Sequence, residues 1–176
     1  MSIQTARMHA VQLAKQFGLD EKPPVNVYDI ARELGLRVVS ANLGEDVSGL
    51  LITNDDSSIV CLQASDAPSR KRFTLAHEIA HHVLGHQFER GEHVHVDHGN
   101  YISQRGLRAS TGLDPKEIEA NQFAATLLMP PQLLRAEVQK RMGKQALLDS
   151  HVSELARLFE VSEQAMTIRL STLGLL

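Results

Sequence analysis

The chain has 176 residues, of which 43% are hydrophobic and 22% are charged, and its formal net charge is −3. This composition is typical of a soluble globular protein, and the slight negative charge argues against a broad electrostatic interaction with nucleic acid. The single cysteine, Cys61, excludes an internal disulfide. The chain contains neither a recognisable signal peptide nor the ~18 consecutive apolar residues of a membrane span, so we expect a cytoplasmic protein without membrane contact.

The region before residue 64 predicts two helices followed by a small sheet. Apolar residues recur at helical spacing over residues 2–17, and Asn26 precedes a second, shorter helix that ends before Gly35. Strands are expected at residues 36–40, 48–53 and 58–63, where apolar side chains cluster. The last two strands form a hairpin around a polar turn. This hairpin either contributes to the core or offers a strand edge to an extended peptide.

The next helix, expected from Pro68 to Gly85, contains the pattern His-Glu-x-x-His as His77, Glu78 and His81. Residues four apart on a helix lie on one face, about 5–6 Å between Cβ atoms, so both imidazoles can reach one zinc ion. Glu78 lies roughly 100° further round the helix and cannot easily join the same ligand set. It can instead take a proton from a water in the fourth coordination position. The pattern therefore predicts a zinc hydrolase, and a peptidase in particular.

A polar segment follows the predicted helix. Seven of the nine histidines lie between His77 and His98, and residues 86–112 show no convincing period, although residues 93–98 alternate as a short strand does. A loop of this length is more often functional than accidental, and it can fold over a metal cleft. One of its side chains can then stabilise the oxyanion of a tetrahedral intermediate. The candidates for this role are Tyr101, His93, His95 and His98.

Catalytic zinc commonly takes a third protein ligand, which can be a carboxylate. The candidates are Glu89, Glu92, Asp97, Glu117 and Glu119. Glu117 shares a helix face with Asn121, which can orient a zinc-bound histidine, whereas Glu119 is expected to face solvent. Asp114 and Glu117 also have the spacing of a capping box, in which Glu117 would fold back to the backbone. The spacing alone leaves both roles of Glu117 open. His82 and His86 rank below Glu117 as ligands, because of their rotation on the helix and their spacing.

The C-terminal third predicts further helices. They are expected at residues 114–129, 131–141, 152–159 and 162–173, with Pro130 and Gly143 as breaks. Residues 155–162 are similar to the start of a helix-turn-helix. Because no basic surface accompanies them, we expect these residues to pack against the core, and we expect no direct binding of nucleic acid.

Two segments together resemble the ImmA/IrrE family of metallo-endopeptidases: residues 72–81 and residues 117–130. The resemblance implies a thermolysin-like zincin fold of the α+β class, mostly helical, with a small three-stranded sheet before the His-Glu-x-x-His helix and a C-terminal helical bundle. It implies His77, His81 and Glu117 as Zn²⁺ ligands and Glu78 as the general base. Mn²⁺ or Fe²⁺ can occupy the same donor set. It also implies a protein substrate, typically a helix-turn-helix repressor encoded nearby, whose cleavage relieves repression of stress, defence or mobile-element genes.

We expect residues 1–176 to form one metallopeptidase domain. Its expected parts are the N-terminal helices (1–35), the small sheet (36–63), the catalytic core (66–130) and the C-terminal helices (131–176). Two other functions fit the same scaffold: a catalytically silent regulatory protein that binds a partner, and a zinc hydrolase with a small-molecule substrate. The intact motif argues against the silent regulator, because binding alone does not require Glu78.

Overall fold

The computed structural model describes residues 2–19, 21–54, 57–86, 94–98, 114–142 and 147–176. Its helices are α1 (Ile3–Gln16), α2 (Val27–Glu33), α3 (Pro68–Val83), α4 (Pro115–Leu128), α5 (Pro131–Met142), α6 (Asp149–Phe159) and α7 (Glu163–Thr172). Its strands are β1 (Leu36–Ala41), β2 (Val47–Thr53), β3 (Ser58–Gln63) and β4 (Val94–His98). The expected helices and strands are confirmed; α6 begins three residues earlier than expected. None of the described helices is both long enough and apolar enough to span a membrane.

The four strands form one sheet in the order β1-β3-β2-β4. β1 pairs with β3 in parallel, and β2 pairs antiparallel with both β3 and β4. The three strands expected before the His-Glu-x-x-His helix are confirmed, and the alternating segment after that helix supplies the fourth. Both hairpin strands, β2 and β3, are therefore internal. Of the two alternatives for the hairpin, the free strand edge is wrong, because β4 returns from beyond α3 and pairs with β2. The outer strands of the described sheet are β1 and β4.

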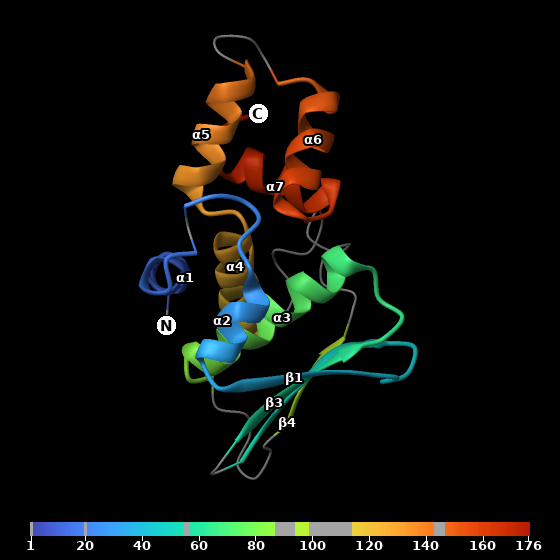
Figure 1. The fold of residues 1–176 in the computed structure, drawn as a ribbon. Coiled ribbons are helices and arrows are strands. Elements are labelled where there is room, and N and C mark those ends of the chain that lie inside the picture. The colour runs from blue at the N-terminus through green and yellow to red at the C-terminus, as the bar shows by residue number, and fades with distance from the viewer. Residues whose placement is uncertain (1, 20, 55–56, 87–93, 99–113, 143–146) are drawn as a thin grey trace.

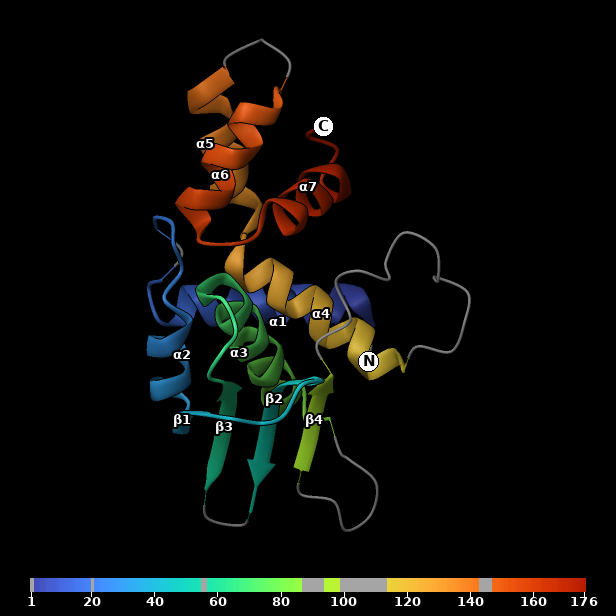
Figure 2. The same cartoon turned by 90° about the vertical axis from the view of Figure 1, so that its right-hand side faces the viewer.

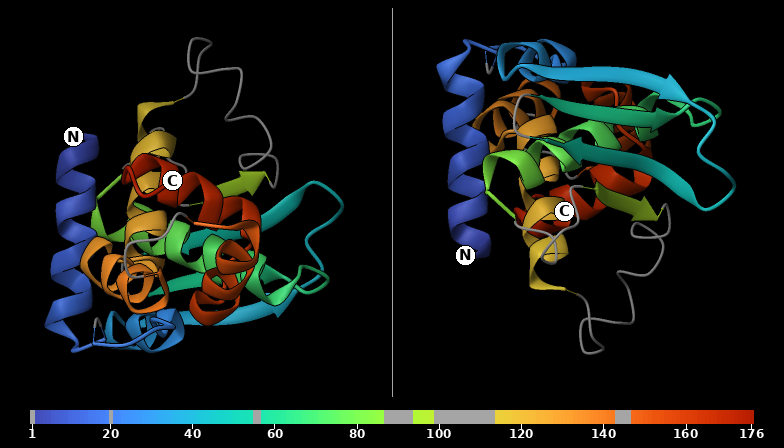
Figure 3. Two further views of the ribbon diagram at one scale, coloured as in Figure 1. Left: turned by 90° about the horizontal axis from the view of Figure 1, so that it is seen from above. Right: turned by 90° about the horizontal axis from the view of Figure 1, so that it is seen from below.

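Helices cover one face of this sheet in successive layers (Figures 1 and 2). α3 packs directly on β2 and β3, α4 packs on α3, and α1 packs on α4. The view from below in Figure 3 shows the strands in front of these helices. α5, α6 and α7 form a separate group at the end of the molecule opposite the sheet (Figures 1 and 2). The helix that carries the His-Glu-x-x-His pattern therefore lies between the sheet and α4.

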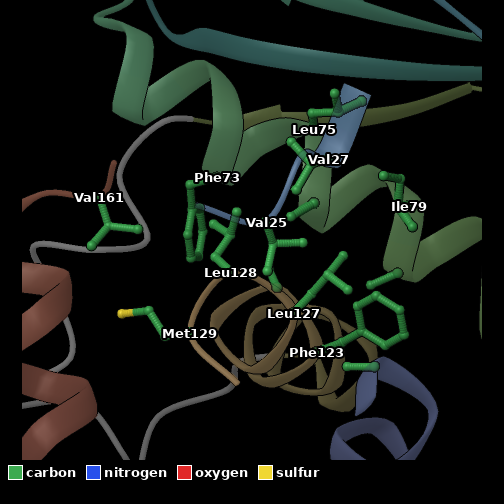
Figure 4. Packing of buried hydrophobic residues seen from close by; sticks show 14 of the residues in the cluster. Val25, Val27, Phe73, Leu75, Ile79, Phe123, Leu127, Leu128, Met129 and Val161 are labelled. Atoms are coloured by element: carbon green, nitrogen blue, oxygen red, sulfur yellow. The ribbon is translucent and has the colours of Figure 1, made fainter. Parts of the chain in front are cut away.

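α3 is covered on nearly all sides along its central part, where the ten residues from Arg72 to His81 are all buried. Figure 4 shows that its apolar side chains meet those of α4 and of the segment before α2. The labelled contributors are Phe73, Leu75 and Ile79 of α3, Phe123, Leu127 and Leu128 of α4, Val25 before α2, and Val27, the first residue of α2. Burial of each large apolar side chain stabilises the fold by about 1.5–3 kcal/mol. The same packing holds the polar side chains of α3 and α4 in fixed positions.

Two buried arginines connect the C-terminal helices to these layers, and we call them the arginine junction: Arg72 of α3 and Arg169 of α7. Arg72 donates to the Val25 carbonyl at 2.9 Å and pairs at 3.2 Å with Glu160, in the turn between α6 and α7. Arg169 donates through Nε and Nη2 to the Met129 carbonyl at 3.2 and 3.1 Å. Met129 is the C-cap of α4, where the helix dipole favours a cation. Burial, followed by the charge of a neighbouring arginine, lowers the pKa of Arg169 to about 10, so it stays charged at neutral pH.

Candidate metal centre

Three side chains from α3 and α4 converge in the layer between these helices. The Nε2 atoms of His77 and His81 lie 3.0 Å apart. The carboxylate of Glu117 lies 3.2 Å from His77 Nε2 through Oε2 and 3.3 Å from His81 Nε2 through Oε1. Both histidines are 1% exposed and Glu117 is 9% exposed. We call these three residues the metal cluster, because each offers a ligand atom to a common point.

The distances within the metal cluster fit a divalent metal. At zinc–ligand bonds of about 2.0–2.1 Å, two tetrahedral ligand atoms lie about 3.3 Å apart. The observed separations of 3.0, 3.2 and 3.3 Å come within a few tenths of an ångström of that value. Buried nitrogen and oxygen lone pairs that face one another are stabilised when they share a cation. Two imidazoles and a carboxylate form the His₂Glu set of catalytic zinc sites, and the same donors suit Mn²⁺ and Fe²⁺.

The start of α4 explains why Glu117 points into the cluster. Asp114 is the N-cap residue, and its carboxylate accepts a hydrogen bond from the Lys116 N–H at 2.9 Å, while Pro115 occupies the first helical position. The carboxylate of Glu117 contacts the two histidines instead of returning to the backbone of Asp114. The capping-box alternative for Glu117 is therefore wrong, and the helix start is stabilised by Asp114 without it.

Glu78 lies outside the metal cluster, on the side of α3 that faces β2. It is fully buried, and its Oε1 lies 3.5 Å from the position that a Cβ atom on Gly49 would occupy. The same Cβ atom would lie 2.3 Å from Cγ2 of Thr74, one helical turn before Glu78. Only glycine at this position of β2 lets α3 approach the sheet so closely. The sheet therefore sets the position of Glu78, as α4 sets the geometry of the ligands.

Glu119 departs from its expected position. It is 5% exposed, and its Oε2 lies 3.2 Å from Nε2 of His86, so the expectation that Glu119 faces solvent is wrong. The other ring nitrogen of His86, Nδ1, lies 3.1 Å from Nδ1 of His81. α4 is covered by α3 on one side and by α1 on another, so more than one of its faces is shielded from solvent. His86 thus contacts a metal-cluster residue without belonging to the cluster.

Comparison with known proteins agrees with this geometry. Residues 31–171 match the peptidase M78 family, described as the IrrE N-terminal-like domain. The chain belongs to this metallopeptidase family. An uncharacterized immunity region protein 2 of Bacillus phage phi105 is 23% identical over 140 residues, which cover 78% of this chain and 81% of that protein.

A solved Mycobacterium tuberculosis transcriptional regulator shares the fold of this M78 family chain, with a TM-score of 0.58 and 21% sequence identity. The likeness covers 97% of this chain, which spans only 47% of the regulator's length. Since the identity is low, the likeness supports the α+β fold and carries no information about substrate.

Other candidate residues of the M78 chain have different outcomes. His82 is half-buried, burial lowers its pKa, and it is not part of the ligand group in the described residues. Asn121 is 5% exposed, and within the described part of the chain its Oδ1 has no hydrogen-bond partner. Its role as the partner of a zinc-bound histidine stays a prediction. Four candidates lie outside the described residues: Glu89, Glu92, His93 and Tyr101.

The other two oxyanion candidates and the remaining carboxylate lie on β4, whose backbone alone is described at these positions. His95 pairs with Leu51 of β2, and His98 pairs with Val47. Asp97 lies opposite Gly49, the residue against which Glu78 packs. The assignment of an oxyanion-stabilising side chain among the four candidates therefore stays a prediction.

Proposed function

We propose that the chain is a zinc-dependent endopeptidase that cleaves a helix-turn-helix repressor and thereby relieves repression of stress, defence or mobile-element genes. The observation that carries this proposal is the convergence of His77, His81 and Glu117, with the buried Glu78 directly after His77 on the same helix. Membership of a metallopeptidase family supports the reaction class. The name of the phage relative, an immunity region protein, supports a link to repressor control.

The residues of the site divide the chemistry between them. His77, His81 and Glu117 would hold the metal and leave one position open. A zinc ion held there would lower the pKa of a bound water and polarise the scissile carbonyl. Glu78, on the adjacent face of α3, accepts the proton of the attacking water and returns it to the nitrogen of the leaving amine. Burial of the site excludes bulk water, which strengthens these electrostatic interactions.

The test is Glu78→Gln, which preserves the size of the side chain and removes its basicity. We expect this variant to keep its zinc content and to lose cleavage of the helix-turn-helix protein encoded beside it. Glu33→Gln is the matched control, because Glu33 is an exposed residue of α2 and the same change there should leave cleavage intact. Cleavage at the wild-type rate by Glu78→Gln would show that Glu78 is not the base.

The same mixture separates the two alternative functions. A single specific cut in the repressor, seen by mass spectrometry, supports the peptidase. A stable complex with no cut in the presence of zinc supports a catalytically silent regulator. Hydrolysis of small amides or esters, with neither complex nor cut, supports a small-molecule hydrolase.

A further inference from the structure

We propose that His86 and Glu119 are positioning residues of the metal centre, which hold His81 with its Nε2 lone pair turned towards the metal. Neither residue belongs to the metal cluster. Their contacts form a continuous path from Nδ1 of His81, the ring nitrogen outside the metal cluster, through the His86 ring to the carboxylate of Glu119. This inference deepens the proposed function and rests on it.

The backbone at the end of α3 fixes the place of His86. The C-cap residue is Leu84, and the next residue, Gly85, has φ +61°, the left-handed conformation that ends many helices. The N–H of His86 then donates to the His81 carbonyl at 3.1 Å. This hydrogen bond defines a Schellman motif. In that motif the side chain of the second residue after the C-cap packs on the residue three positions before the C-cap. His86 is therefore folded back onto His81 by the helix end itself.

In most Schellman motifs that side-chain contact is apolar. Here it joins two imidazoles, whose ring centroids lie 4.9 Å apart with an interplanar angle of 73°. The two Nδ1 atoms are 3.1 Å apart, which is hydrogen-bonding distance. A histidine at this position adds a directed contact where the fold itself requires only an apolar one.

The path permits one arrangement of protons that suits metal binding. A neutral imidazole has one N–H and one lone pair, so His81 must carry its proton on Nδ1 if Nε2 is to bind a metal. That N–H can donate to the Nδ1 lone pair of His86, which places the proton of His86 on Nε2. The Nε2–H of His86 then donates to Glu119 Oε2 at 3.2 Å. An ionised carboxylate only accepts, so Glu119 sets the direction of the whole path.

Burial makes this path effective. The side chains of His86 and Glu119 are each 6% exposed, so solvent screens their interaction only weakly. A carboxylate at the end of the path stabilises positive charge on the imidazoles and so makes His81 Nε2 a better electron donor. Removal of a hydrogen-bonding partner of this kind typically weakens metal binding about 10–100-fold.

The pair also joins the end of α3 to α4, so a purely structural role is the competing explanation. Such a role predicts a loss of stability in the metal-free protein and no separate effect on metal affinity. His86→Phe separates the two roles, because phenylalanine keeps the apolar contact of the Schellman motif and removes both ring nitrogens. Glu119→Gln keeps an oxygen that accepts from His86 and removes only the charge, so it remains interpretable if His86→Phe does not fold.

The experiment measures the dissociation constant for Zn²⁺ by competition with a chromogenic chelator, and the melting temperature of the metal-free protein. We expect a dissociation constant about 10–100-fold higher in His86→Phe, and a smaller increase in Glu119→Gln, with no matching loss in metal-free melting temperature. The absorption spectrum of the Co²⁺-loaded protein should change in His86→Phe, because His81 is reoriented.

The matched control is Gln122→Ala, on the same helix as Glu119. Gln122 accepts two hydrogen bonds from Arg7 of α1, at 3.1 and 2.7 Å, and does not contact the histidines. This variant should lower the melting temperature and leave the Zn²⁺ dissociation constant unchanged. An unchanged dissociation constant in both His86→Phe and Glu119→Gln would overturn the positioning role while leaving the proposed function intact. If the wild-type protein itself bound no Zn²⁺, the proposed function would fail, and the positioning role with it.

Discussion

The metal cluster and the arginine junction both bury polar side chains next to α4, but they satisfy them differently. At the junction, Arg169 donates to a carbonyl at the C-terminus of α4, so its charge is stabilised within the chain. In the metal cluster, the Nε2 atoms of two imidazoles and the carboxylate oxygens of Glu117 face one another at 3.0–3.3 Å. The comparison teaches that burial alone does not mark a candidate metal site; convergence of possible ligand atoms on one point does.

The largest difference between the two regions should appear when one side chain of the metal cluster is removed by substitution. Glu117→Ala should weaken Zn²⁺ binding by more than about a hundredfold, beyond the range found for residues that only orient a ligand. In the metal-free protein, Glu117→Ala should change the free energy of unfolding less than a substitution at the arginine junction does. Zinc content after dialysis, measured by elemental analysis, checks the first expectation, and urea unfolding of the metal-free protein checks the second.

Asp114→Ala is the control for Glu117→Ala at the same helix start. It removes the cap of α4 and should cost about 1 kcal/mol of stability without loss of zinc. Full zinc content in Glu117→Ala would show that another residue supplies the third ligand.

The arginine junction should show the opposite behaviour. Arg169→Met leaves the Met129 carbonyl buried without its donors, which should lower the free energy of unfolding by about 2–3 kcal/mol. The Zn²⁺ dissociation constant should stay at its wild-type value. Urea unfolding and chelator competition measure the two quantities. Arg157→Met, which removes only an exposed donor to Ser153, is the control and should have a much smaller effect.

A weakened metal affinity in Arg169→Met would contradict the separation of the two regions. It would mean that the C-terminal helices set the geometry of α3 and α4.

The close approach of the sheet to Glu78 gives a third, smaller effect. Gly49→Ala places a methyl group against Cγ2 of Thr74 and should cost about 1–2 kcal/mol, with reduced cleavage at unchanged zinc content. Thr74→Ser removes that Cγ2 atom, so the double variant should recover much of the stability. Urea unfolding of the two single variants and the double variant forms the test. Additive losses in the double variant would show that the contact between Gly49 and Thr74 does not limit the approach of α3.

The sequence predicts His77, Glu78 and His81 as site residues because their relation depends on one helix alone. The direction of Glu117 depends on how α4 lies against α3, which spacing within α4 cannot specify. The capping-box alternative stayed open for that reason. The error over Glu119 has the same origin, since a helix wheel assumes one covered face and α4 has two neighbours.

One missed contact did have a local signal. Gly85 was expected to end the helix, and a Schellman motif there would have placed His86 against His81. The exposure of the hairpin, in contrast, could not be predicted. It depends on the return of β4 from beyond α3, a pairing between segments far apart in the chain.

The smallest effect expected is at Glu137 of α5, a carboxylate whose partners lie within its own helix. Hydrogen bonds from Lys140 and then from Arg141 hold its pKa below the ordinary value of 4.5. A carboxyl group whose pKa is lower in the folded than in the unfolded chain stabilises the fold at pH values above its unfolded pKa. That stabilisation is lost as the pH falls through the folded pKa. Because Lys140 is mostly exposed, Glu137→Gln should cost less than about 1 kcal/mol at pH 7. The difference from wild type in urea unfolding should shrink as the pH falls below 4.5 and vanish once the pH is below the lowered pKa of folded Glu137. The Zn²⁺ affinity of Glu137→Gln should equal that of the wild type, because Glu137 belongs to neither the metal cluster nor its positioning residues. A loss of stability that did not depend on pH would show that Glu137 stabilises the fold by the packing of its side chain and not by its charge.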